Sequence, residues 1–192
     1  MHRLNTSFVL GYHGCEQAVA DQLLAGNPFT PSTNAYDWLG HGIYFWESNP
    51  QRGLEFARER PGRGSAASAP AVVGAVIDLG YCLDLQSSTG IAAVSAAYWD
   101  YLDYSERSGS KVPQNRGGED SLMRDLDCAV LNHLHAVRAA GKLEPFDTVR
   151  AVFLEGKPLY PKSGFREKTH IQLCVRNSGC IKGVFRVGAE QG

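Results

Sequence analysis

The chain has 192 residues, which suits a single domain or one domain with a long insertion. Hydrophobic residues make up 43% of it and charged residues 20%, as in an ordinary globular protein with a sizeable core. The formal net charge is −1 and no long basic run occurs. This excludes a broad electrostatic surface for nucleic acid but leaves room for a small local basic patch.

The sequence predicts no membrane segment and no metal site. No stretch approaches the roughly 18 apolar residues that span a bilayer. Residues 1–7 lack the apolar core of a signal peptide. The five cysteines are scattered, odd in number and never spaced as CxxC, so we expect neither a disulfide framework nor a zinc site. Reduced thiols and a cytoplasmic location fit this pattern.

The first half of the chain alternates strands and helices. Clusters of glycine, proline and asparagine mark the turns, and apolar runs rich in β-branched and aromatic residues mark the strands. The predicted elements are a strand at 7–12 that ends at His13-Gly14, a helix at 16–25, a loop at 27–39, a strand at 42–46, a helix from 50 to about 60, a flexible connection at 62–70 and a strand at 71–79.

The second half contains the clearest predicted helix, at 120–140, which carries an apolar stripe at near-helical spacing. Asp120 is its expected N-cap and Gly141 its expected stop. More strands lie near the C-terminus. The other predicted elements are a helix at 91–104, a polar loop at 105–119, and strands at 148–154, 169–175 and 181–187.

The strand at 169–175 alternates cleanly, so its two faces have different expected roles. One face is expected to be core and the other can line a cleft. The core face carries Ile171, Leu173 and Val175, and the cleft face carries His170, Gln172 and Cys174.

Two segments place polar groups inside apolar strands, Tyr12-His13-Gly14 and Gly42-Ile43-Tyr44-Phe45. A histidine at a strand end beside glycine can present its imidazole and nearby backbone groups to a ligand, because glycine lets the ligand approach the main chain. Tyr44 can stack on a flat amide ring such as nicotinamide, and a neutral imidazole can hydrogen-bond a ribose hydroxyl.

These segments give the chain its resemblance to a known family. The stretch from Leu10 to about Ala57 resembles the first half of the catalytic domain of poly(ADP-ribose) polymerase-like ADP-ribosyltransferases. That family has His-Gly-Ser/Thr on its first strand, then a helix and a donor loop, then Gly-x-Gly-Ile-Tyr-Phe before another helix. Here the corresponding segments are His13-Gly14-Cys15 and Gly40-His41-Gly42-Ile43-Tyr44-Phe45, and the separation 44 − 13 = 31 residues is similar to the family's.

The resemblance implies an α+β fold, with a split, mostly antiparallel β-sheet core and flanking helices. Residues 1–192 would form a single ADP-ribosyltransferase-like domain with a mainly helical insertion around 88–141. The implied activity is cleavage of NAD⁺ at the nicotinamide–ribose bond and transfer of one ADP-ribose unit to a protein, nucleic-acid or small-molecule acceptor. The size resembles that of stand-alone bacterial toxins, for which an antitoxin or inhibitor protein is a candidate partner. The residues implied in NAD⁺ binding are His13, Gly14, Gly42, Ile43, Tyr44 and Phe45.

The sequence departs from the family at two places. Cys15 stands where the family has Ser or Thr, which replaces a hydroxyl with a weaker hydrogen-bonding thiol. The family's third signature residue, often a glutamate at the start of a late strand, has three candidates. Strand alternation favours Gln172 beside His13 and Tyr44 as the catalytic set, with Glu167 and His170 as the other candidates for the third position.

Other readings stay open at this stage. NAD⁺ hydrolysis needs the same donor site, and a non-catalytic NAD⁺- or ADP-ribose-binding module would suit the altered signature. A thiol hydrolase using Cys15 and His13 requires the first strand to continue through Gly14. Asp37-Trp38 could contact the adenosine side of the donor or anchor the loop, and Arg52, Arg58 and Arg60 are expected on a solvated helix face.

Overall fold

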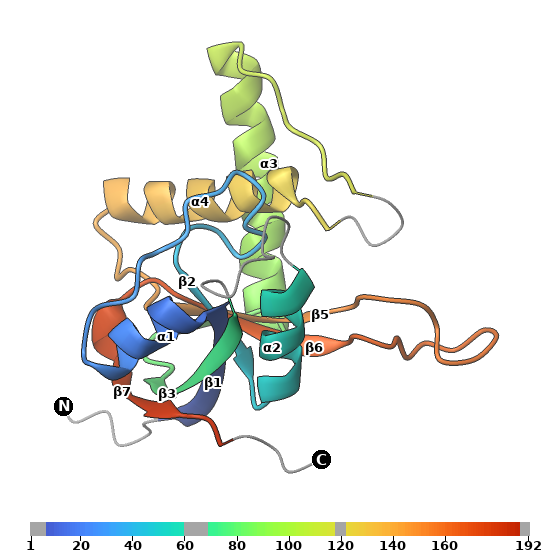
Figure 1. Ribbon diagram of the computed structural model, residues 1–192. Helices are drawn as coiled ribbons and strands as arrows, with labels where there is room; N and C mark the ends of the chain where they lie inside the picture. The colour runs from blue at the N-terminus through green and yellow to red at the C-terminus, as the bar shows by residue number, and fades with distance from the viewer. Residues whose placement is uncertain (1–6, 60–68, 118–121, 189–192) are drawn as a thin grey trace.

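The computed structural model describes residues 7–59, 69–117 and 122–188 (Figure 1). Within these ranges the chain forms seven strands that pair into one sheet, four α-helices and a short 3₁₀ turn at Ser178–Cys180. The elements are β1 Phe8–Glu16, α1 Gln17–Leu24, β2 Ile43–Glu47, α2 Pro50–Glu59, β3 Pro70–Asp78, β4 Cys82–Asp84, α3 Ser88–Ser108, α4 Asp125–Ala140, β5 Thr148–Phe153, β6 His170–Val175 and β7 Ile181–Arg186.

The strands follow the order β4-β5-β6-β2-β1-β3-β7. Only the β4–β5 pair is parallel among them, so the expected α+β class with a mostly antiparallel sheet is confirmed. The expected split of the sheet is not observed among the described residues, because all seven strands belong to one continuous sheet, although the contact between β1 and β2 is short. The strands β1 and β2 pair only at Gly11↔Glu47 and Tyr12↔Trp46 and then diverge, whereas β1 pairs with β3 along its whole length.

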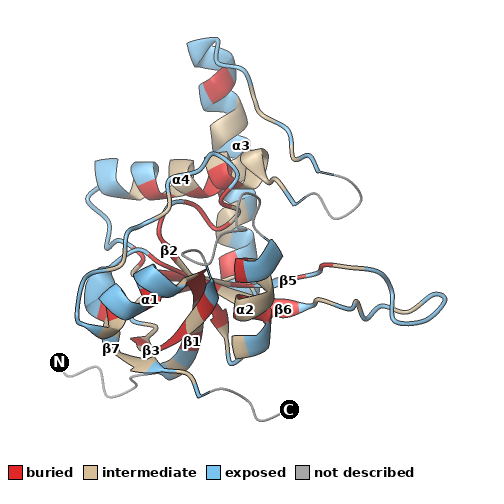
Figure 2. Cartoon of the chain, viewed as in Figure 1, coloured by how far each residue is buried: buried red, intermediate tan, exposed pale blue. Residues whose placement is uncertain are grey.

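Helices cover both faces of the sheet and leave a gap on one of them. On one face α1 buries Ala20 and Leu23 against Cys15 and Val73. On the opposite face α2 packs over β1 and β3, and α3 and α4 cover the β4–β5 end through a core that includes Val130. Figure 2 shows the buried residues concentrated along the strands and on the inner sides of the helices. The surface between α2 and α4 is where the site described below lies.

Most predicted elements of the first half form at the expected places, with one informative error. The strand expected to end at His13-Gly14 continues to Glu16. It continues because His13 and Gly14 pair with Val73 and Val72 of β3, so the glycine does not interrupt the ladder. The flexible connection predicted at 62–70 lies mostly in 60–68, outside the described residues, and Pro70 already belongs to β3.

The second half differs more from its prediction. The helix α3 is longer than expected and ends at Gly109, whose left-handed backbone (φ 67°) favours glycine. Helix α4 begins at Asp125 rather than near 120, and the predicted cap Asp120 lies outside the described residues. The N-cap residue Arg124 makes no side-chain cap hydrogen bond; instead the side-chain oxygen of Asn115, from the preceding loop, accepts the backbone N–H groups of Leu126 (2.9 Å) and Asp127 (3.3 Å). The short strand β4 was not predicted at all.

None of the described helices is long and apolar enough to cross a bilayer. The three late strands form where expected, and β5 and β6 pair so that Ala151 faces Gln172 and Phe153 faces His170. Beyond this pairing, residues 154–169 form a hairpin extension that projects from the body of the protein (Figure 1).

Candidate active site

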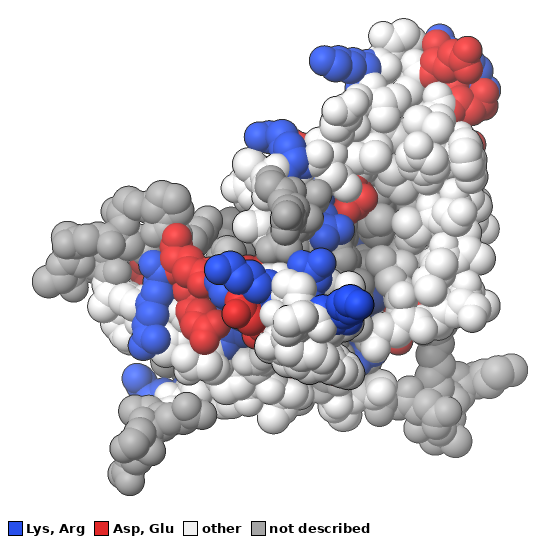
Figure 3. All heavy atoms as spheres, turned by 90° about the vertical axis from the view of Figure 1, so that its right-hand side faces the viewer, with Lys and Arg blue, Asp and Glu red and all other residues white. Residues whose placement is uncertain are grey.

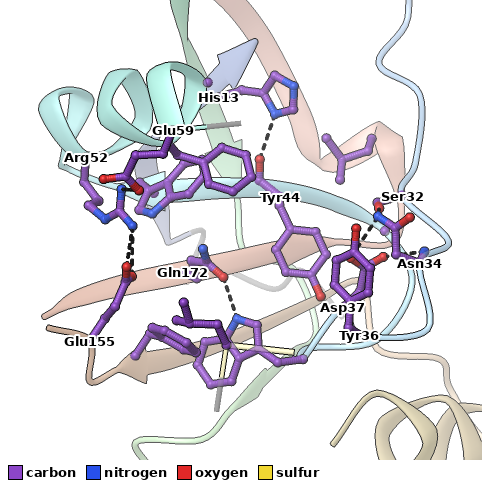
Figure 4. A pocket seen from close by; sticks show the side chains of 18 of the residues that line it. His13, Ser32, Asn34, Tyr36, Asp37, Tyr44, Arg52, Glu59, Glu155 and Gln172 are labelled. Atoms are coloured by element: carbon purple, nitrogen blue, oxygen red, sulfur yellow. Dashed lines mark hydrogen bonds and ion pairs between the residues drawn. The ribbon is translucent and has the colours of Figure 1, made fainter. Parts of the chain in front are cut away.

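A cavity of about 420 Å³ opens where β1 and β2 diverge. Its walls come from the end of β1, the loop at 30–38, β2, α2, Leu122 before α4, the end of β5 with Glu155 beyond it, and the middle of β6. Figure 4 shows the side chains of these segments pointing toward one another. The structure therefore brings together most of the predicted site residues, namely His13, Gly14, Gly42, Ile43, Tyr44 and Gln172.

His13 is held in place by the residue with which it was predicted to act. Its Nδ1 lies 2.9 Å from the backbone oxygen of Tyr44, across the gap between the two strands (Figure 4). A carbonyl oxygen only accepts, so Nδ1 carries the proton in this bond and Nε2 is the acceptor nitrogen of the neutral ring. The rings of Phe29 and Phe45 lie against the imidazole, with centroids at 5.3 and 5.7 Å. Phe45 is fully buried and orients His13 from the core side.

Tyr44 is held through its backbone oxygen, which bonds His13, and through its side-chain hydroxyl. Its hydroxyl accepts the backbone N–H of Leu39 at 2.9 Å and donates to the backbone oxygen of Gly40 at 2.8 Å. Burial raises the pKa of this hydroxyl well above its usual value, and Cys174 and Asp37 add to the shift. The phenol is therefore neutral, and its ring is a fixed wall of the cavity.

Gln172 lies in the cavity as strand alternation predicted, but its amide is already engaged on one side. The indole Nε1 of Trp38 donates to its Oε1 at 2.5 Å. An indole N–H is a donor only, which places the oxygen toward Trp38 and leaves the amide NH₂ on the other side. Figure 4 shows the nitrogen of Gln172 turned away from this bond. The third position thus offers a hydrogen-bond donor.

The two other candidates for the third position lie elsewhere. Glu167 is exposed in the hairpin extension, where its carboxylate accepts the backbone N–H of Lys157 at 3.3 Å. His170 is 5% exposed, its Nδ1 bonds the backbone oxygen of Lys168 at 2.6 Å, and burial lowers its pKa. Neither side chain lines the cavity among the described residues.

The sequence prediction missed a carboxylate that does line the cavity. Glu155 is 7% exposed and forms a bidentate ion pair with Arg52, at 2.8 and 2.9 Å. Arg52 is 5% exposed, so its predicted place on a solvated helix face is wrong, while Arg58 is exposed as expected and Arg60 lies outside the described residues. The sequence contains a pattern that identifies Glu155. Every second residue from β5 onward lies on the same buried face, and this face consists of Val149, Ala151, Phe153 and Glu155.

The two glycines that line the cavity, Gly14 and Gly42, allow other parts of the protein to pack closely against them. A Cβ on Gly14 would collide with the backbone oxygen of Gly53 in α2, and one on Gly42 with the thiol of Cys174. Gly42 also pairs through its backbone with Ser32, at 2.7 and 3.1 Å, which ties the 27–39 loop to the cavity. These glycines are therefore required for the close packing that forms the cavity.

Two of the loop residues in the cavity wall, Asp37 and Trp38, also hold the loop in place. Asp37 is 9% exposed, and its carboxylate accepts the backbone N–H of Asn34 at 2.8 Å. Trp38 lies against Phe153, with ring centroids 4.7 Å apart. Both residues line the cavity and both anchor the loop, so the two alternatives considered from the sequence are compatible.

Cys15 is unsuited to act as a nucleophile in this cavity. Because β1 continues through Gly14, Cys15 does share a face with His13. However, the thiol residue is only 4% exposed and is packed with Ala20 and Leu23 beneath α1. The described residues also contain no cluster of three or more His, Cys, Asp and Glu side chains that could hold a metal ion.

The cavity combines aromatic walls with more acidic than basic groups. The aromatic lining residues are Tyr36, Trp38, Tyr44, Trp46, Phe56 and Phe153. The charged lining residues are Asp37, Glu59, Glu155 and Arg52. Aromatic faces and carboxylates both attract a flat organic cation. A volume of about 420 Å³ suits a ligand fragment of drug size.

Comparisons with known proteins leave the family open. No family model matches the sequence, and no solved structure matches the fold. The chain is similar to the uncharacterized protein MJ0359 of Methanocaldococcus jannaschii, with 25% identity over 188 residues. The similarity covers 89% of this chain and 83% of that relative, whose name states no activity.

Proposed function

We propose that this chain binds NAD⁺ in the cavity, cleaves it at the nicotinamide–ribose bond and transfers a single ADP-ribose unit to an acceptor. The observation that carries the proposal is the 2.9 Å bond between His13 and the backbone of Tyr44. It joins the two motifs that resemble the ADP-ribosyltransferases at the mouth of one aromatic, acidic cavity.

The nicotinamide end of NAD⁺ suits this cavity chemically. Its pyridinium ring is flat and positively charged, so it gains from the fixed ring of Tyr44 and from the carboxylate of Asp37 in the cavity wall, whereas the charge of Glu155 is compensated by Arg52. The cavity volume of about 420 Å³ suits nicotinamide and its ribose rather than the whole dinucleotide. The adenosine half would then extend along the loop at 30–38.

Two residues are placed to hold the ribose. In the tautomer set by Tyr44, Nε2 of His13 accepts a hydrogen bond from a ribose hydroxyl. The amide NH₂ of Gln172, turned away from Trp38, donates to a ribose oxygen. Both contacts fix the sugar while its C1′ develops positive charge, and orientation lowers much of the barrier.

The proposed reaction needs no reagent other than NAD⁺ and the acceptor. The C1′–N bond breaks and its electron pair leaves with neutral nicotinamide. A nucleophile on the acceptor then donates an electron pair to C1′ and loses its proton to solvent. A neutral amide at residue 172 stabilises the developing cation less than a carboxylate would, which favours one transfer to a well-positioned nucleophile over chain elongation.

The test is incubation of the purified protein with NAD⁺ labelled in its adenosine half, with a cell lysate as the source of acceptors. Released nicotinamide reports bond cleavage, and labelled macromolecules report transfer. We expect His13→Ala and Tyr44→Ala to lower both signals by about a hundredfold or more, because the first removes a group that holds the ribose and the second removes the ring on which the nicotinamide stacks.

Matched controls lie outside the cavity. His41 and Tyr104 are exposed, so His41→Ala and Tyr104→Ala should retain both signals. Label transfer that survives substitution of both His13 and Tyr44 would refute the proposed site. Nicotinamide release without any labelled acceptor would assign the chain to the NAD⁺ hydrolases instead.

A further inference from the structure

The hairpin extension at 154–169 is an ordered ribbon rather than a loose loop. Backbone hydrogen bonds tie its two arms together at three levels, from Lys168 to Glu155 (3.0 Å), from Glu167 to Lys157 (3.1 Å) and from Leu159 to Phe165 (3.1 Å). Figure 1 shows it projecting from the sheet, away from the helices. Its side chains are therefore presented at defined positions on both sides of the ribbon.

Large apolar side chains lie exposed on this ribbon. Phe165 is 67% exposed, Leu159 58% and Tyr160 57%, and Phe165 is the most exposed large apolar residue in the described part of the chain. Such side chains scattered singly would need no explanation, but three within seven residues form a patch. Two of them are aromatic, and aromatic faces are the surfaces on which nucleic-acid bases stack.

The same segment is basic in a chain that is slightly acidic overall. Residues 157–168 carry Lys157, Lys162, Arg166 and Lys168 against the single acid Glu167, whereas the whole chain has a net charge of −1. Figure 3, in which the hairpin faces the viewer, shows blue side chains gathered on it, with red side chains beside them. This is a local basic patch of the kind that the overall composition left open.

The root of the hairpin forms part of the cavity wall. Glu155 starts one arm and lines the cavity, and Lys168 ends the other arm and binds Glu59, a second lining residue, at 2.8 Å. A strand lying along the hairpin would therefore lead directly to the cavity mouth. A partner held here is in position to supply the nucleophile.

We infer that the hairpin is a docking site for single-stranded nucleic acid, and that this strand is the acceptor of the ADP-ribose unit. Bases stack on Phe165 and Tyr160, and Lys157 and Lys162 contact phosphates. An acidic protein would meet the lysines but not the rings. A membrane surface would meet both, but it could not reach into a recessed cavity as a flipped nucleotide can. The acceptor role rests on the proposed function, whereas the docking role does not.

The test measures binding by fluorescence anisotropy, with a labelled oligothymidine of about 12 nucleotides and the full chain without NAD⁺. We expect Phe165→Ala with Tyr160→Ala to weaken binding by roughly tenfold or more, because each stacked base contributes a factor of about five or greater. Lys157→Gln with Lys162→Gln should reduce the slope of log affinity against log salt by about 1.4, or about 0.7 for each lost phosphate contact.

Matched controls carry the same changes away from the hairpin. Trp99 is 65% exposed on α3, and Lys142 is exposed after α4, so Trp99→Ala and Lys142→Gln should bind the oligonucleotide as the wild type does. Circular dichroism verifies that every variant is folded. Equal losses in the controls, wild-type binding by the hairpin variants, or no binding by the wild type would overturn the docking site.

Two further measurements separate the alternatives. Binding of duplex DNA as tightly as the single strand contradicts base stacking, and binding of anionic phospholipid vesicles without the oligonucleotide assigns the hairpin to membranes. For the acceptor role, labelling of the oligonucleotide from NAD⁺ should fall tenfold or more in the hairpin variants, and oligonucleotide-dependent nicotinamide release should fall with it, because the docked strand supplies the nucleophile. Failure of nicotinamide release in the wild type refutes the proposed function and leaves the anisotropy result standing.

Discussion

The indole nitrogen of Trp38 donates to the side-chain oxygen of Gln172 at 2.5 Å, across 134 residues of sequence. This bond determines which end of the amide is turned toward the cavity. It makes Trp38 a positioning residue for Gln172, although Trp38 comes from the loop and Gln172 from the centre of β6.

Changes at these two residues should alter the rate of NAD⁺ cleavage in opposite directions. Trp38→Phe keeps the ring but frees the amide to rotate, and should lower kcat for nicotinamide release roughly tenfold, the value of about one hydrogen bond. Gln172→Glu should raise kcat, because one carboxylate oxygen still accepts from Trp38 while the other stabilises the cation at C1′. A faster Trp38→Phe enzyme would contradict the assigned orientation, and Trp99→Phe serves as the control.

Removing one partner of the Arg52–Glu155 pair should destabilise the protein much more than replacing both partners by apolar residues. The two side chains are 6% and 9% exposed. Arg52→Met leaves a buried carboxylate without its main partner and should lower the free energy of unfolding by about 3–5 kcal/mol. Arg52→Met with Glu155→Leu should recover most of this loss, because no buried charge remains. Urea denaturation measures both.

The exposed pair Arg107–Asp103 provides the matched control. Its side chains are 69% and 62% exposed, so Arg107→Met should change the free energy of unfolding by less than about 1 kcal/mol. A loss at Arg52 no larger than the loss at Arg107 would show that the pair in the cavity wall is solvated in solution.

The sequence predicted the site better where the motif is local than where it depends on distant contacts. His13 and Tyr44 could be identified because each belongs to a short pattern of fixed spacing, and Gln172 because a strand alternates its faces. Arg52 could not be placed correctly, since a charge on an amphipathic helix is normally solvated and only Glu155, 103 residues later, explains its burial.

The same distinction applies to the fold. Strands β1, β2 and β3 have strong apolar patterns and were predicted within a few residues, but β4 has three residues and exists only because β5 pairs with it. The start of α4 was placed too early because the N–H groups of its first turn are accepted by Asn115, a residue of the preceding loop, rather than by a side chain at the N-cap. Neither contact leaves a periodic signal in the sequence.

His135 should make the protein less stable in mild acid. Burial, with Arg176 and Arg138 nearby, lowers its pKa from 6.5 to about 3. Below pH 6.5 the unfolded chain binds a proton that the folded chain does not, so stability falls as the pH decreases from about 6.5 toward about 3. The expected slope approaches about 1.4 kcal/mol per pH unit.

Urea denaturation at several pH values in this range measures the slope. In His135→Leu the contribution of this residue is absent, and the variant should be less sensitive to acid than the wild type. His170 adds a contribution of the same sign, because burial lowers its pKa as well, so some slope should remain. Identical pH dependence in wild type and His135→Leu would show that His135 is protonated in the folded state.

Gly14 gives the sharpest test of whether the motif glycine serves packing or only the ligand. A Cβ at this position would meet the backbone oxygen of Gly53, which cannot rotate away, so Gly14→Ala must push α2 from the sheet. The expected loss of stability is about 1–3 kcal/mol. Because α2 also carries Arg52, Phe56 and Glu59 of the cavity wall, KM for NAD⁺ should rise in the same variant.

Gly183→Ala is the control, since nothing lies within 4 Å of a Cβ at that position in β7. It should change neither the melting temperature nor KM. If Gly14→Ala raised KM without lowering the melting temperature, the glycine would serve ligand approach alone. If both changed together, the His-Gly element would act by setting the distance between α2 and β1, and so the width of the cavity in which His13 and Tyr44 meet.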